Sequence, residues 1–589
     1  MEIRHAFDFL HHQLENNPIE DCLNYKVNGS WVKYSTQEFM EIVHKLSLGF
    51  LKLGLKPGDK VAIISPNRPE WNFIDQSCQE IGVVTVPMYP TITVEDYRYI
   101  FQHAEVKMIF AADAELMSRV NQALEGQSVD HIYSFDEIEG AENWKRILGL
   151  DPHGDLSVLE EYRNRVSEDD LLTIIYTSGT TGRPKGVMLS HWNVTSNALA
   201  LSKMLDGVLK PGEDRVLSFL PLCHIYERVA IYFYQQNSLG VYYAESMDTI
   251  GENLKEIKPH MFTCVPRLLE KVYDKIVSKG YELPLYKRKL FFWAIGLGLR
   301  FDPNIQYGWW YQFRLKIARK LIFSKWKEAL GGDIKFISSA AAALQPRLAR
   351  IFWAAEIPIY EGYGLTETSP AITANGPGKG QTKIGTVGQI IQDVQVKIAD
   401  DGEILCKGPN VMQGYYKNPE LTSEVLQDDW FHTGDIGVIE DGFLRITDRK
   451  KEMFKTSGGK YIAPQLMENK FKESQFIEQI MVVGEGRKFP SALIVPNFKS
   501  LQEWCLQNEV DETNPQVLVQ HPKVQDLYQI EIKRYNEEFG NWEQIKKFEI
   551  VESTWGVDTG ELTPTLKLKR RVIKEKFNEL IESIYMMSS

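Results

Sequence analysis

A run of eleven residues between two apolar segments constrains this chain more than any other feature. The run, 176–186, reads Tyr-Thr-Ser-Gly-Thr-Thr-Gly-Arg-Pro-Lys-Gly, and residues 171–175 and 187–189 flank it. The flanking segments have the composition of buried strands. Glycines let a backbone turn tightly and approach a ligand, hydroxyls donate hydrogen bonds, and Lys185 adds a point charge. The run therefore predicts a strand–loop–strand unit whose loop can hold a polyphosphate.

The spacing differs from that of a Walker A loop, in which Gly-Lys precedes Ser or Thr. Lys185 here follows Pro184 and precedes Gly186. A surface hairpin that binds nothing is the alternative interpretation. Dense glycine and hydroxyl residues directly after a buried strand favour phosphate binding. The expected contacts are Thr177, Ser178, Gly179, Thr180, Thr181, Gly182 and Lys185.

The segment from Tyr176 to His191 resembles the phosphate loop of the adenylate-forming superfamily, which includes acyl-CoA synthetases, adenylation domains and insect luciferases. Further segments follow in the family's motif order, so the resemblance extends over almost the whole chain. A Pro-Leu-x-His motif ends at His224, and its extension through Tyr226 to Arg228 is similar to long-chain fatty acyl-CoA synthetases. A lone histidine is more often a packed core residue. The resemblance instead implies that His224 lies near the reacting carboxylate.

Composition limits the class of protein. The chain has 589 residues, of which 43% are hydrophobic and 25% charged, so two or more domains are expected. Its net charge of −12 argues against a nucleic-acid binder. The first residues lack a signal-peptide pattern, no apolar stretch reaches the length of a membrane span, and the six cysteines are scattered. We expect a cytoplasmic enzyme with free thiols.

Helical and strand patterns alternate up to about residue 170, which predicts an α/β domain with a mostly parallel sheet. This part shows no catalytic constellation, and we interpret it as scaffold. After Asp448 the pattern changes to a glycine turn, a helix and two strands, which predicts a small α+β domain. With the resemblance, residues 1–447 are expected to hold ATP and the fatty acid on mixed or parallel sheets flanked by helices. Residues 448–589 are expected to form a mobile catalytic lid.

An aromatic and basic segment lies at about 276–330. Apolar residues that could share one helix face alternate with cations. The apolar set is Leu315, Ala318, Leu321, Ile322 and Trp326, and the cations are Arg314, Lys316, Arg319, Lys320, Lys325 and Lys327. The pattern is typical of an interfacial helix, although a helix packed on its own domain with extended cations explains it as well. The resemblance implies an insertion of long-chain synthetases here. We expect it to collect lipid at the inner face of a membrane; the oligomeric state stays open.

Two segments resemble the family's adenine and phosphate motifs. In the first, Ala340 and Ala341 replace the family's two glycines, where an alanine restricts the backbone if φ is positive. The second runs from Tyr360 to Pro370. There the resemblance implies that Tyr363 stacks on adenine, Thr366 holds the α-phosphate and Glu367 binds Mg²⁺, for which a hard oxygen ligand is suited. Gly364 belongs to the same motif, and Glu361 stands where relatives contact the adenine amino group.

The remaining motifs lie toward the C-terminus. By resemblance, Asp435 accepts the ribose hydroxyls, Arg449 also reaches the ribose, and Lys451 is the hinge. Gly458 and Gly459 resemble the loop that lines the pantetheine channel. In the last motif, Lys567 takes the catalytic lysine position, although Leu566 replaces the usual glycine and Lys569 lies nearby. From the bare sequence this last segment is a solvated basic helix start, and Asp435 is a turn-capping residue.

The resemblance implies a fatty acid–CoA ligase that uses ATP, Mg²⁺ and coenzyme A as co-substrate. A fatty acid would react with ATP to give acyl-AMP and pyrophosphate, and a thiol would then take the acyl group and release AMP. The proposed catalytic set is Lys567, His224, Thr366 and Glu367. Two alternatives stay open: a ligase that delivers the acyl group to a carrier-protein thiol, and a non-catalytic homologue that binds lipid or nucleotide.

Overall fold

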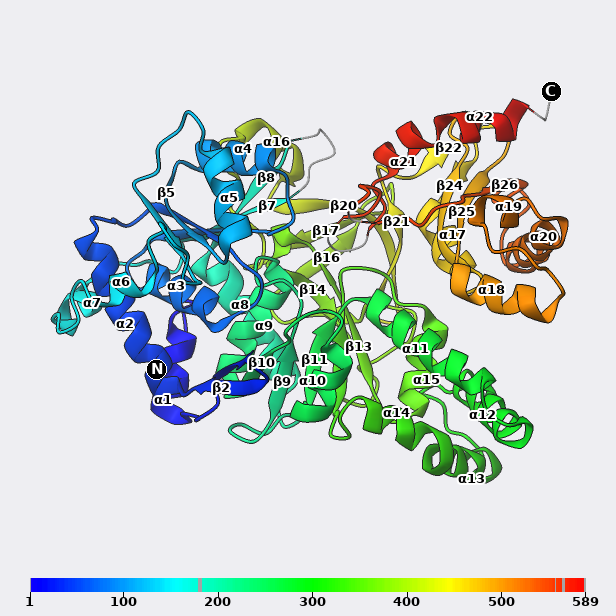
Figure 1. Ribbon diagram of the computed structural model, residues 1–589, viewed down its shortest axis with the longest axis horizontal. Coiled ribbons are helices and arrows are strands. Elements are labelled where there is room, and N and C mark those ends of the chain that lie inside the picture. Colours follow the sequence, from blue (N-terminus) through cyan, green and yellow to red (C-terminus); the bar gives the residue numbers. More distant parts are fainter. Residues whose placement is uncertain (1, 178–182, 557, 564–566, 587–589) are drawn as a thin grey trace.

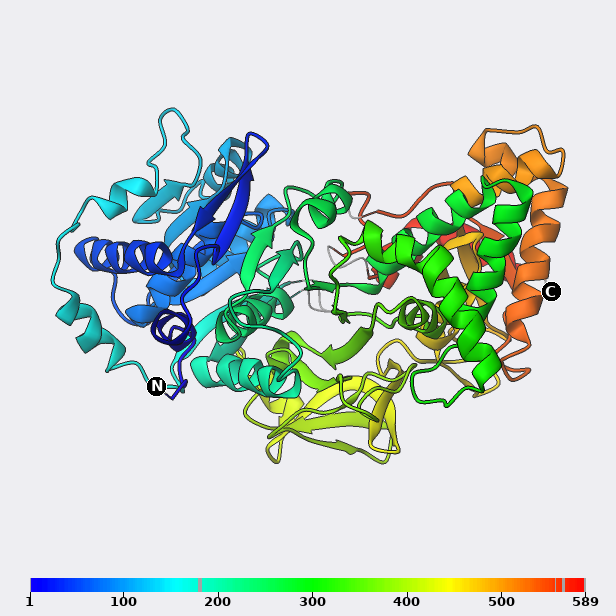
Figure 2. The ribbon, with the colours of Figure 1, turned by 90° about the horizontal axis from the view of Figure 1, so that it is seen from below.

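The computed structural model describes residues 2–177, 183–556, 558–563 and 567–586. Two large sheets form the body of the molecule, and a smaller antiparallel sheet lies against one side of them (Figures 1 and 2). The chain beyond the small sheet forms a separate lobe, drawn in yellow, orange and red at the right of Figure 1. This combination of helices with parallel and mixed sheets confirms the predicted α/β class.

The first sheet contains the strands on either side of residues 178–182. Its strand order is β18-β8-β7-β4-β3-β5-β6. The strands from β7 to β6 run parallel, whereas β8 is antiparallel to β7, and β18 to β8. The apolar composition of β3 fits a strand that helices cover on both faces. The strands are β3 (Lys60–Ile64), β4 (Val84–Met88), β5 (Val106–Ala111), β6 (His131–Ser134), β7 (Leu171–Thr177), β8 (Lys185–Ser190) and β18 (Gly414–Tyr415).

Helices of the N-terminal part cover this sheet. A capping box starts the long helix α2, where the Ser35 hydroxyl accepts from the Glu38 backbone and the Glu38 carboxylate accepts from the Ser35 backbone. These helices are α2 (Thr36–Lys52), α3 (Pro69–Glu80), α4 (Val94–Ala104), α5 (Ala114–Ala123), α6 (Lys145–Leu148) and α7 (Leu156–Arg163).

The second sheet has the order β15-β14-β13-β12-β11-β9-β10-β1-β2. Its central strands, from β13 to β1, run parallel, so their carboxyl ends meet at one edge. That edge is where ligands bind in open α/β sheets. The strands are β1 (Leu23–Val27), β2 (Ser30–Tyr34), β9 (Arg215–Ser218), β10 (Gly240–Tyr243), β11 (Met261–Cys264), β12 (Phe336–Ser339), β13 (Ile359–Gly364), β14 (Ala371–Ala374) and β15 (Gln389–Ile390).

Helix α9 joins the two sheets through a buried polar contact with α3. The Arg228 guanidinium on α9 lies 2.6 Å from a carboxylate oxygen of Asp75 on α3, and both side chains are almost fully buried. Removing one partner of a buried ion pair strongly destabilises a folded protein, because the other charge is left buried without a partner. The other helices of this half are α1 (Asp8–Asn16), α8 (His191–Met204), α9 (Ile225–Gln236), α10 (Ile250–Ile257), α11 (Pro266–Tyr281), α12 (Leu285–Gly298), α13 (Trp309–Ala318), α14 (Ser324–Ala329) and α15 (Pro346–Ala354).

The small sheet is antiparallel and was not anticipated from the sequence. Its order is β16-β17-β20-β19, and β21 pairs with β20 (Figure 2). The short helix α16 (Pro419–Val425) lies beside it. The strands are β16 (Gln395–Ile398), β17 (Glu403–Lys407), β19 (Leu426–Gln427), β20 (Trp430–Glu440) and β21 (Phe443–Arg449).

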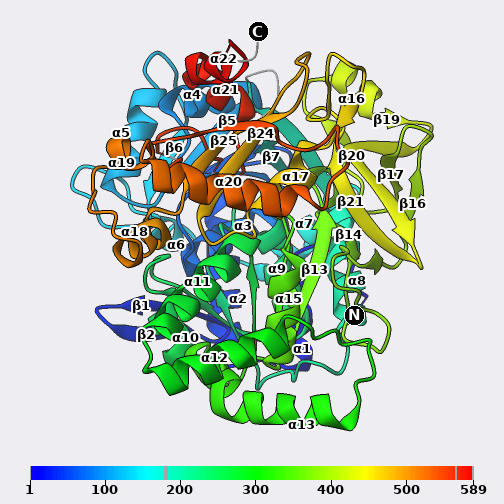
Figure 3. The same ribbon diagram turned by 90° about the vertical axis from the view of Figure 1, so that its right-hand side faces the viewer.

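The C-terminal domain, from β22 onward, has hydrophobic clusters of its own. In its sheet, β24 pairs antiparallel with β25, and β25 pairs parallel with β26. Figure 3 shows α18 and α20 at the front of this domain. The elements are β22 (Phe454–Lys455), β23 (Tyr461–Ile462), β24 (Ile477–Val483), β25 (Ser491–Pro496), β26 (Lys547–Ile550), α17 (Pro464–Phe471), α18 (Phe498–Gln507), α19 (Pro515–Leu518), α20 (Pro522–Asn536), α21 (Arg570–Lys576) and α22 (Asn578–Met586).

The aromatic and basic segment forms α12, α13 and α14, which extend from the body at the lower right of Figure 1. Leu315, Ala318 and Trp326 are buried as expected, but Leu321 is 45% exposed. The prediction of a single apolar face was wrong for Leu321 because residues Arg319–Phe323 form a π-helical turn. Such a turn inserts a residue and shifts the helical register. Among the described residues, no helix combines the length and the apolar content that crossing a bilayer requires.

Candidate active site

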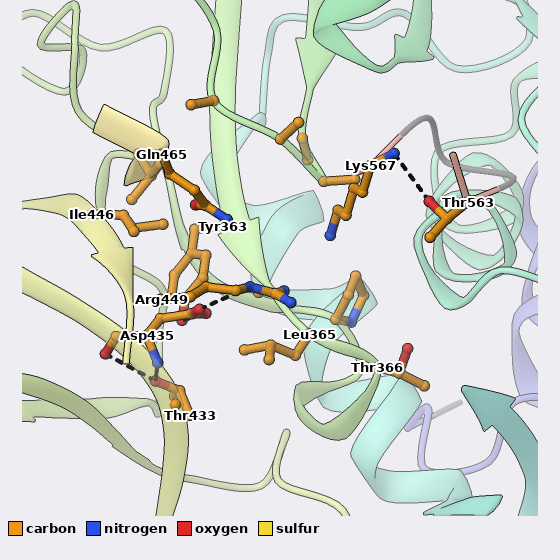
Figure 4. A pocket seen from close by; sticks show the side chains of 18 of the residues that line it. Tyr363, Leu365, Thr366, Thr433, Asp435, Ile446, Arg449, Gln465, Thr563 and Lys567 are labelled. Atoms are coloured by element: carbon orange, nitrogen blue, oxygen red, sulfur yellow. Dashed lines mark hydrogen bonds and ion pairs between the residues drawn. The ribbon is translucent and has the colours of Figure 1, made fainter. Parts of the chain in front are cut away.

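One cavity lies where the second sheet, the small sheet and the C-terminal domain meet. Residues from all three line it, together with the ends of β7 and β8. Figure 4 shows Lys567 and Arg449 extending into this space from opposite sides, with Tyr363 and Asp435 nearby. The cavity therefore gathers side chains that are more than 380 residues apart in sequence, from Lys185 to Lys567.

Lys185 and Glu367 meet at the mouth of the phosphate-loop hairpin. The Lys185 ammonium lies 2.9 Å from Oε1 of Glu367, and the Tyr415 hydroxyl donates to the same oxygen at 2.8 Å. Burial alone would raise the pKa of Glu367, but the Lys185 ammonium holds it below its ordinary value. Glu367 is thus a buried carboxylate that stays charged, as a metal ligand requires.

Glu367 lies on a short 3₁₀ turn, Thr366–Thr368, directly after β13. The approach to this turn admits no side chain at Gly364, because a Cβ there would lie 1.6 Å from the Pro370 carbonyl oxygen. Thr366 lines the cavity one residue before Glu367. Gly364 is therefore required by packing, and the close approach that it allows positions the side chains of Thr366 and Glu367.

Asp435 is held by two partners at the side of the cavity. The Tyr363 hydroxyl donates to Oδ2 of Asp435 at 2.6 Å, and Arg449 Nε lies 3.3 Å from Oδ1. The register of β20 and β21 places Asp435 opposite Arg449. Burial raises the pKa of Asp435 above its ordinary value, although Arg449 and Tyr363 oppose this. The pair presents one acceptor and one cation to a ligand beside the Tyr363 ring.

Lys567 reaches the cavity from the C-terminal domain (Figure 4). Its backbone N–H donates to the Thr563 hydroxyl at 3.0 Å, and the Thr563 N–H donates to the Lys567 carbonyl oxygen at 2.9 Å. Burial, with the Arg449 guanidinium, lowers the pKa of Lys567 to about 8. Lys569 also lines the cavity; it precedes α21, and its backbone N–H donates to the Glu561 carbonyl oxygen.

His224 caps the N-terminus of α9 and lines the cavity. Its Nδ1 accepts from the Tyr226 backbone N–H at 3.2 Å. Burial, with the Lys567 ammonium, lowers the pKa of His224 to about 4, so the ring is neutral near pH 7. Because Nδ1 accepts, the proton of the neutral ring resides on Nε2, which can donate to a ligand oxygen. The neighbouring thiol of Cys223 also lines the cavity, and burial raises its pKa well above the ordinary value.

The adenine motif lies at the carboxyl ends of β12 and β13. Glu361 is buried, and that burial raises its pKa to about 8, although the Leu344 backbone opposes the shift. Glu361 is therefore mostly protonated at neutral pH. Ala341 has φ of 71°, a conformation that L-residues adopt with strain, whereas Ala340 does not have a positive φ.

Apolar side chains continue the cavity along one face of α9. Val229, Ala230 and Phe233 on that helix line it, together with Met261 on β11 and Phe336 on β12. The register of these strands places Met261 opposite Phe336. The cavity therefore combines a charged end near Lys567 with an apolar extension, as an acid with a hydrocarbon chain requires.

The remaining predicted residues differ in whether they line the cavity. Lys451 lines the cavity on its exposed side, but Gly458 and Gly459 are exposed and do not line it. Thr177 lines the cavity, and its buried hydroxyl has no hydrogen-bond partner among the described residues. The predicted contacts Ser178, Gly179, Thr180, Thr181 and Gly182 lie outside the described residues.

The sequence analysis missed contributors to the site. Nothing in the Gly-Tyr-Tyr run around Tyr415 marks it as a partner of Glu367; the pairing of β18 with β8 brings it there. Lys450, next to the expected hinge residue, pairs with Glu403 at 2.8 Å. Residues such as Tyr89 and Ile100 also line the cavity, so the interpretation of the first 170 residues as scaffold alone was wrong.

Comparisons with known proteins agree with these motifs. The family model described as AMP-binding enzyme matches residues 10–416, and the AMP-binding enzyme C-terminal domain matches residues 452–589. The long-chain-fatty-acid–CoA ligase FadD15 of Mycobacterium bovis is 33% identical, over 95% of this chain and 93% of its own. Long-chain-fatty-acid–CoA ligase 6 of Homo sapiens is 32% identical, over 96% of this chain and 84% of its own.

Solved structures show the same fold. The A domain of a carboxylic acid reductase from Segniliparus rugosus, in complex with AMP and a co-purified carboxylic acid, has a TM-score of 0.74 at 20% identity, covering 99% of this chain and 94% of that one. A Mycobacterium tuberculosis fatty acyl CoA synthetase has a TM-score of 0.60 at 20% identity, covering 98% and 99%. Together with the family models and the near-full-length relatives, these likenesses establish that the chain belongs to the AMP-binding enzymes, the adenylate-forming superfamily that its motifs resemble.

Proposed function

We propose that the protein is a long-chain fatty acid–CoA ligase that uses ATP and Mg²⁺. One observation carries this proposal: the polar groups Lys567, Glu367 and His224 line the same cavity as an apolar extension along α9. The long-chain ligases that match nearly the whole chain support the same activity and do not favour the carrier-protein or non-catalytic alternatives.

In the first half-reaction, a carboxylate oxygen of the fatty acid attacks the α-phosphorus of ATP. The new O–P bond gives acyl-AMP, and the bond to the β-phosphate oxygen breaks to release pyrophosphate. Lys567 stabilises the negative charge that develops on the phosphoryl oxygens, and Thr366 and Lys185 hold the phosphates. The N–H of His224 Nε2 orients the fatty acid carboxylate. The position of these groups around one cavity supports the assignment.

The donor set also fits a magnesium ion. Glu367 offers a buried, charged carboxylate beside the phosphate-loop hairpin, and Mg²⁺ commonly takes one protein carboxylate together with substrate phosphates. When bound, the ion would neutralise phosphate charge. Asp435 and Arg449 hold the ribose, and Tyr363 and Glu361 the adenine. Ala340 and Ala341 form the backbone edge beside the base.

In the second half-reaction, the thiol sulfur of coenzyme A attacks the acyl carbon of acyl-AMP. The C–S bond forms, the C–O bond to AMP breaks, and the thiol proton passes to solvent. We propose that the C-terminal domain, from β22 onward, rotates about Lys451 between the two steps, so that Lys567 leaves and Gly458 and Gly459 approach. Their exposure outside the cavity, while Lys567 lies inside it, supports this division.

A coupled assay tests the function. Purified protein with ATP, Mg²⁺ and a panel of acids from acetate to oleate should form acyl-CoA only when coenzyme A is present, with preference for long chains. Exchange of radiolabelled pyrophosphate into ATP should require the acid. Exchange without thioester formation from coenzyme A would instead indicate a carrier-protein thiol as acceptor, and the absence of exchange would rule out an active ligase.

We further propose that the protein contacts an anionic bilayer through the α13 patch, defined as Trp309, Trp310, Phe313, Lys316 and Lys320. Trp309 is 77% exposed and Trp310 is 56% exposed, and the Trp310 and Phe313 rings stack with centroids 5.9 Å apart. From residue 309 to 327 the sequence contains six cations and no acidic residue, although the whole chain carries −12. Exposed aromatic rings beside cations favour the interface of an anionic membrane.

Vesicle flotation tests this contact. Wild-type protein should float with phosphatidylserine-containing vesicles and much less with phosphatidylcholine alone. Replacing Trp309, Trp310 and Phe313 with alanine should abolish flotation. Trp542→Ala provides the matched control, because Trp542 is also exposed, at 52%, but lies in the C-terminal domain. Unchanged flotation of the triple variant would remove the proposal.

A further inference from the structure

The first turn of α11 contacts the C-terminal domain through an ion pair. Arg267 on this turn donates to Glu478 on β24, and it also donates to Glu270 at 3.1 Å within its own helix. The Arg267 side chain is 17% exposed and Glu478 32% exposed, so water screens the pair only in part. This contact joins two segments that are 211 residues apart in sequence, one in the body of the molecule and one in the C-terminal domain.

A buried glutamine extends this contact toward the nucleotide loop. Gln345 Nε2 donates to Glu270 Oε1 at 3.1 Å and to the Lys472 carbonyl oxygen at 3.3 Å. Arg347 Nε donates in turn to Gln345 Oε1 at 2.8 Å. Gln345 directly follows residues 340–344, which carry the adenine motif. The contact therefore runs from the C-terminal domain to the edge of the nucleotide site without interruption.

Resting on the proposed function, we propose that Arg267, Gln345 and Glu478 form a latch that holds the C-terminal domain in the adenylate-forming orientation. These are positioning residues: they act through Lys567, which this orientation delivers to the cavity. Gly458 and Gly459 lie outside the cavity in the same orientation, so the domain must turn before they can serve the second step. Such a turn must break the Arg267–Glu478 ion pair.

The latch is expected to bias the domain equilibrium without freezing it. A charge-assisted pair that water partly screens shifts a two-state population by roughly threefold to tenfold. A bias of this size favours the first half-reaction yet leaves rotation fast enough for the second. The Gln345 side-chain amide adds a neutral hydrogen bond to the backbone carbonyl oxygen of Lys472. Because the acceptor is in the backbone, this bond does not depend on the side chain at position 472.

Measuring the two half-reactions separately tests the latch. Arg267→Ala and Glu478→Ala should each slow pyrophosphate exchange by roughly threefold to tenfold, whereas transfer from supplied acyl-AMP to coenzyme A should be unchanged or faster. The double variant should be no slower than Arg267→Ala alone, because that variant already removes the contact with Glu478 as well as the contact with Glu270. Equal loss of both half-reactions, or additive effects in the double variant, would overturn the proposal.

Lys335→Ala is the matched control for the loss of a partly buried ion pair. Lys335 lies 2.6 Å from Asp214, and both residues belong to the second-sheet half of the molecule. This variant should lower thermal stability without changing the ratio of the two half-reactions. A shift in that ratio for Lys335→Ala as large as that for Arg267→Ala would show that general loosening, rather than the latch, sets the ratio.

A covalent link provides the second test. All six native cysteines lie in the described residues and are buried, so an Arg267→Cys, Glu478→Cys double variant offers two new accessible thiols. Linked by a short bismaleimide, it should retain pyrophosphate exchange and lose transfer to coenzyme A, while the unlinked variant keeps both. Full transfer by the linked protein would overturn the latch. Failure of the proposed function would differ, since wild-type protein would then lack fatty-acid-dependent exchange.

Discussion

At the scale of single residues, Glu361 shows how burial changes what a side chain can recognise. A protonated carboxyl has one donor and one acceptor, as an amide has, so it can pair with the adenine amino group and the adjacent ring nitrogen. With a pKa raised to about 8 by burial, Glu361 loses this donor as the pH rises through 8. Binding of adenosine should therefore weaken about tenfold from pH 7 to pH 9.

Glu361→Gln separates this effect from the titration of Lys567. Glutamine keeps a donor and an acceptor at every pH, so calorimetry with adenosine should give a flat affinity profile for this variant. Adenosine carries no phosphate, so Lys567 has no charged partner to lose in this measurement. A pH profile in Glu361→Gln as steep as that of the wild type would show that another group controls binding of the base.

Ala341 carries backbone strain that its neighbour Ala340 lacks. The φ of 71° at Ala341 is a conformation that costs an L-residue about 1–2 kcal/mol, and that glycine adopts freely. Glycine relieves this strain but loses more conformational entropy on folding. Ala341→Gly should therefore raise the free energy of unfolding by a net amount of about 0.5–1 kcal/mol. Ala340→Gly, the matched control, should lower it by a similar amount, about 0.5–1 kcal/mol. Urea denaturation of both variants checks the opposite signs.

At the scale of elements, we infer from the lining of the cavity that α9 limits the depth available to an acyl chain. Ala230 lines the cavity between Tyr226 and Phe233 on the same helical face, so its small side chain leaves space there. In Ala230→Phe, the ring should block long substrates: kcat/KM for oleate should fall at least about tenfold, since each lost methylene contact is worth up to about 1–3 kcal/mol. Butyrate turnover should stay within about twofold. Ala230→Val should give an intermediate result, and equal loss for both acids would contradict the assignment.

The elements differ in how far the sequence could predict them. The apolar runs at 171–175 and 187–189 predicted β7 and β8, because strands that are covered on both faces are rich in apolar residues. The antiparallel small sheet was missed because its half-exposed strands, such as β16, alternate over only a few residues. The π-helical turn at Arg319–Phe323 left no periodic signal, since it interrupts the periodicity on which the prediction depended.

At the scale of the whole molecule, Lys567 extends from the C-terminal domain into the cavity in which we propose that adenylation takes place. Lys567→Ala should slow adenylation by roughly 10²–10³, the effect of losing an oxyanion donor, while transfer from supplied acyl-AMP should change little. Lys533→Ala on α20 is the control in the same domain, because Lys533 is exposed and does not line the cavity; its adenylation rate should remain close to that of the wild type. Equal loss of both half-reactions in Lys567→Ala would refute this division of work.

The same lysine sets a pH limit for the first half-reaction. Burial and Arg449 lower the pKa of Lys567 to about 8, so the ammonium form is lost as the pH rises through that value. In the free enzyme, kcat/KM for adenylation should fall about tenfold per unit above pH 8. In a Glu361→Gln background, which removes the titration of Glu361, Lys567→Arg should be less active at pH 7 but should lack this fall, because a guanidinium stays protonated. If Lys567→Arg lost activity over the same pH range as its parent protein, a group other than Lys567 would be responsible for the loss.

The candidate site was predictable residue by residue but not as an arrangement. The resemblance to the family's motifs marked Glu367, Asp435 and Lys567, whereas residue type alone indicated a turn cap for Asp435 and a solvated helix start for Lys567. Their meeting at one cavity depends on strand registers, such as Asp435 opposite Arg449, and on the orientation of the C-terminal domain. Tyr415 carried no signal at all, because its role follows from a two-residue strand at a sheet edge.

The buried thiol of Cys223, next to His224, matters for an enzyme whose intermediate, acyl-AMP, is a reactive mixed anhydride. A sulfur atom must be ionised to compete for an activated acyl group. Because Cys223 lies in the cavity wall with its ionisation strongly suppressed, it is a poor rival to the incoming pantetheine arm. The protein is thereby protected from acylating itself in the interval between its two reactions.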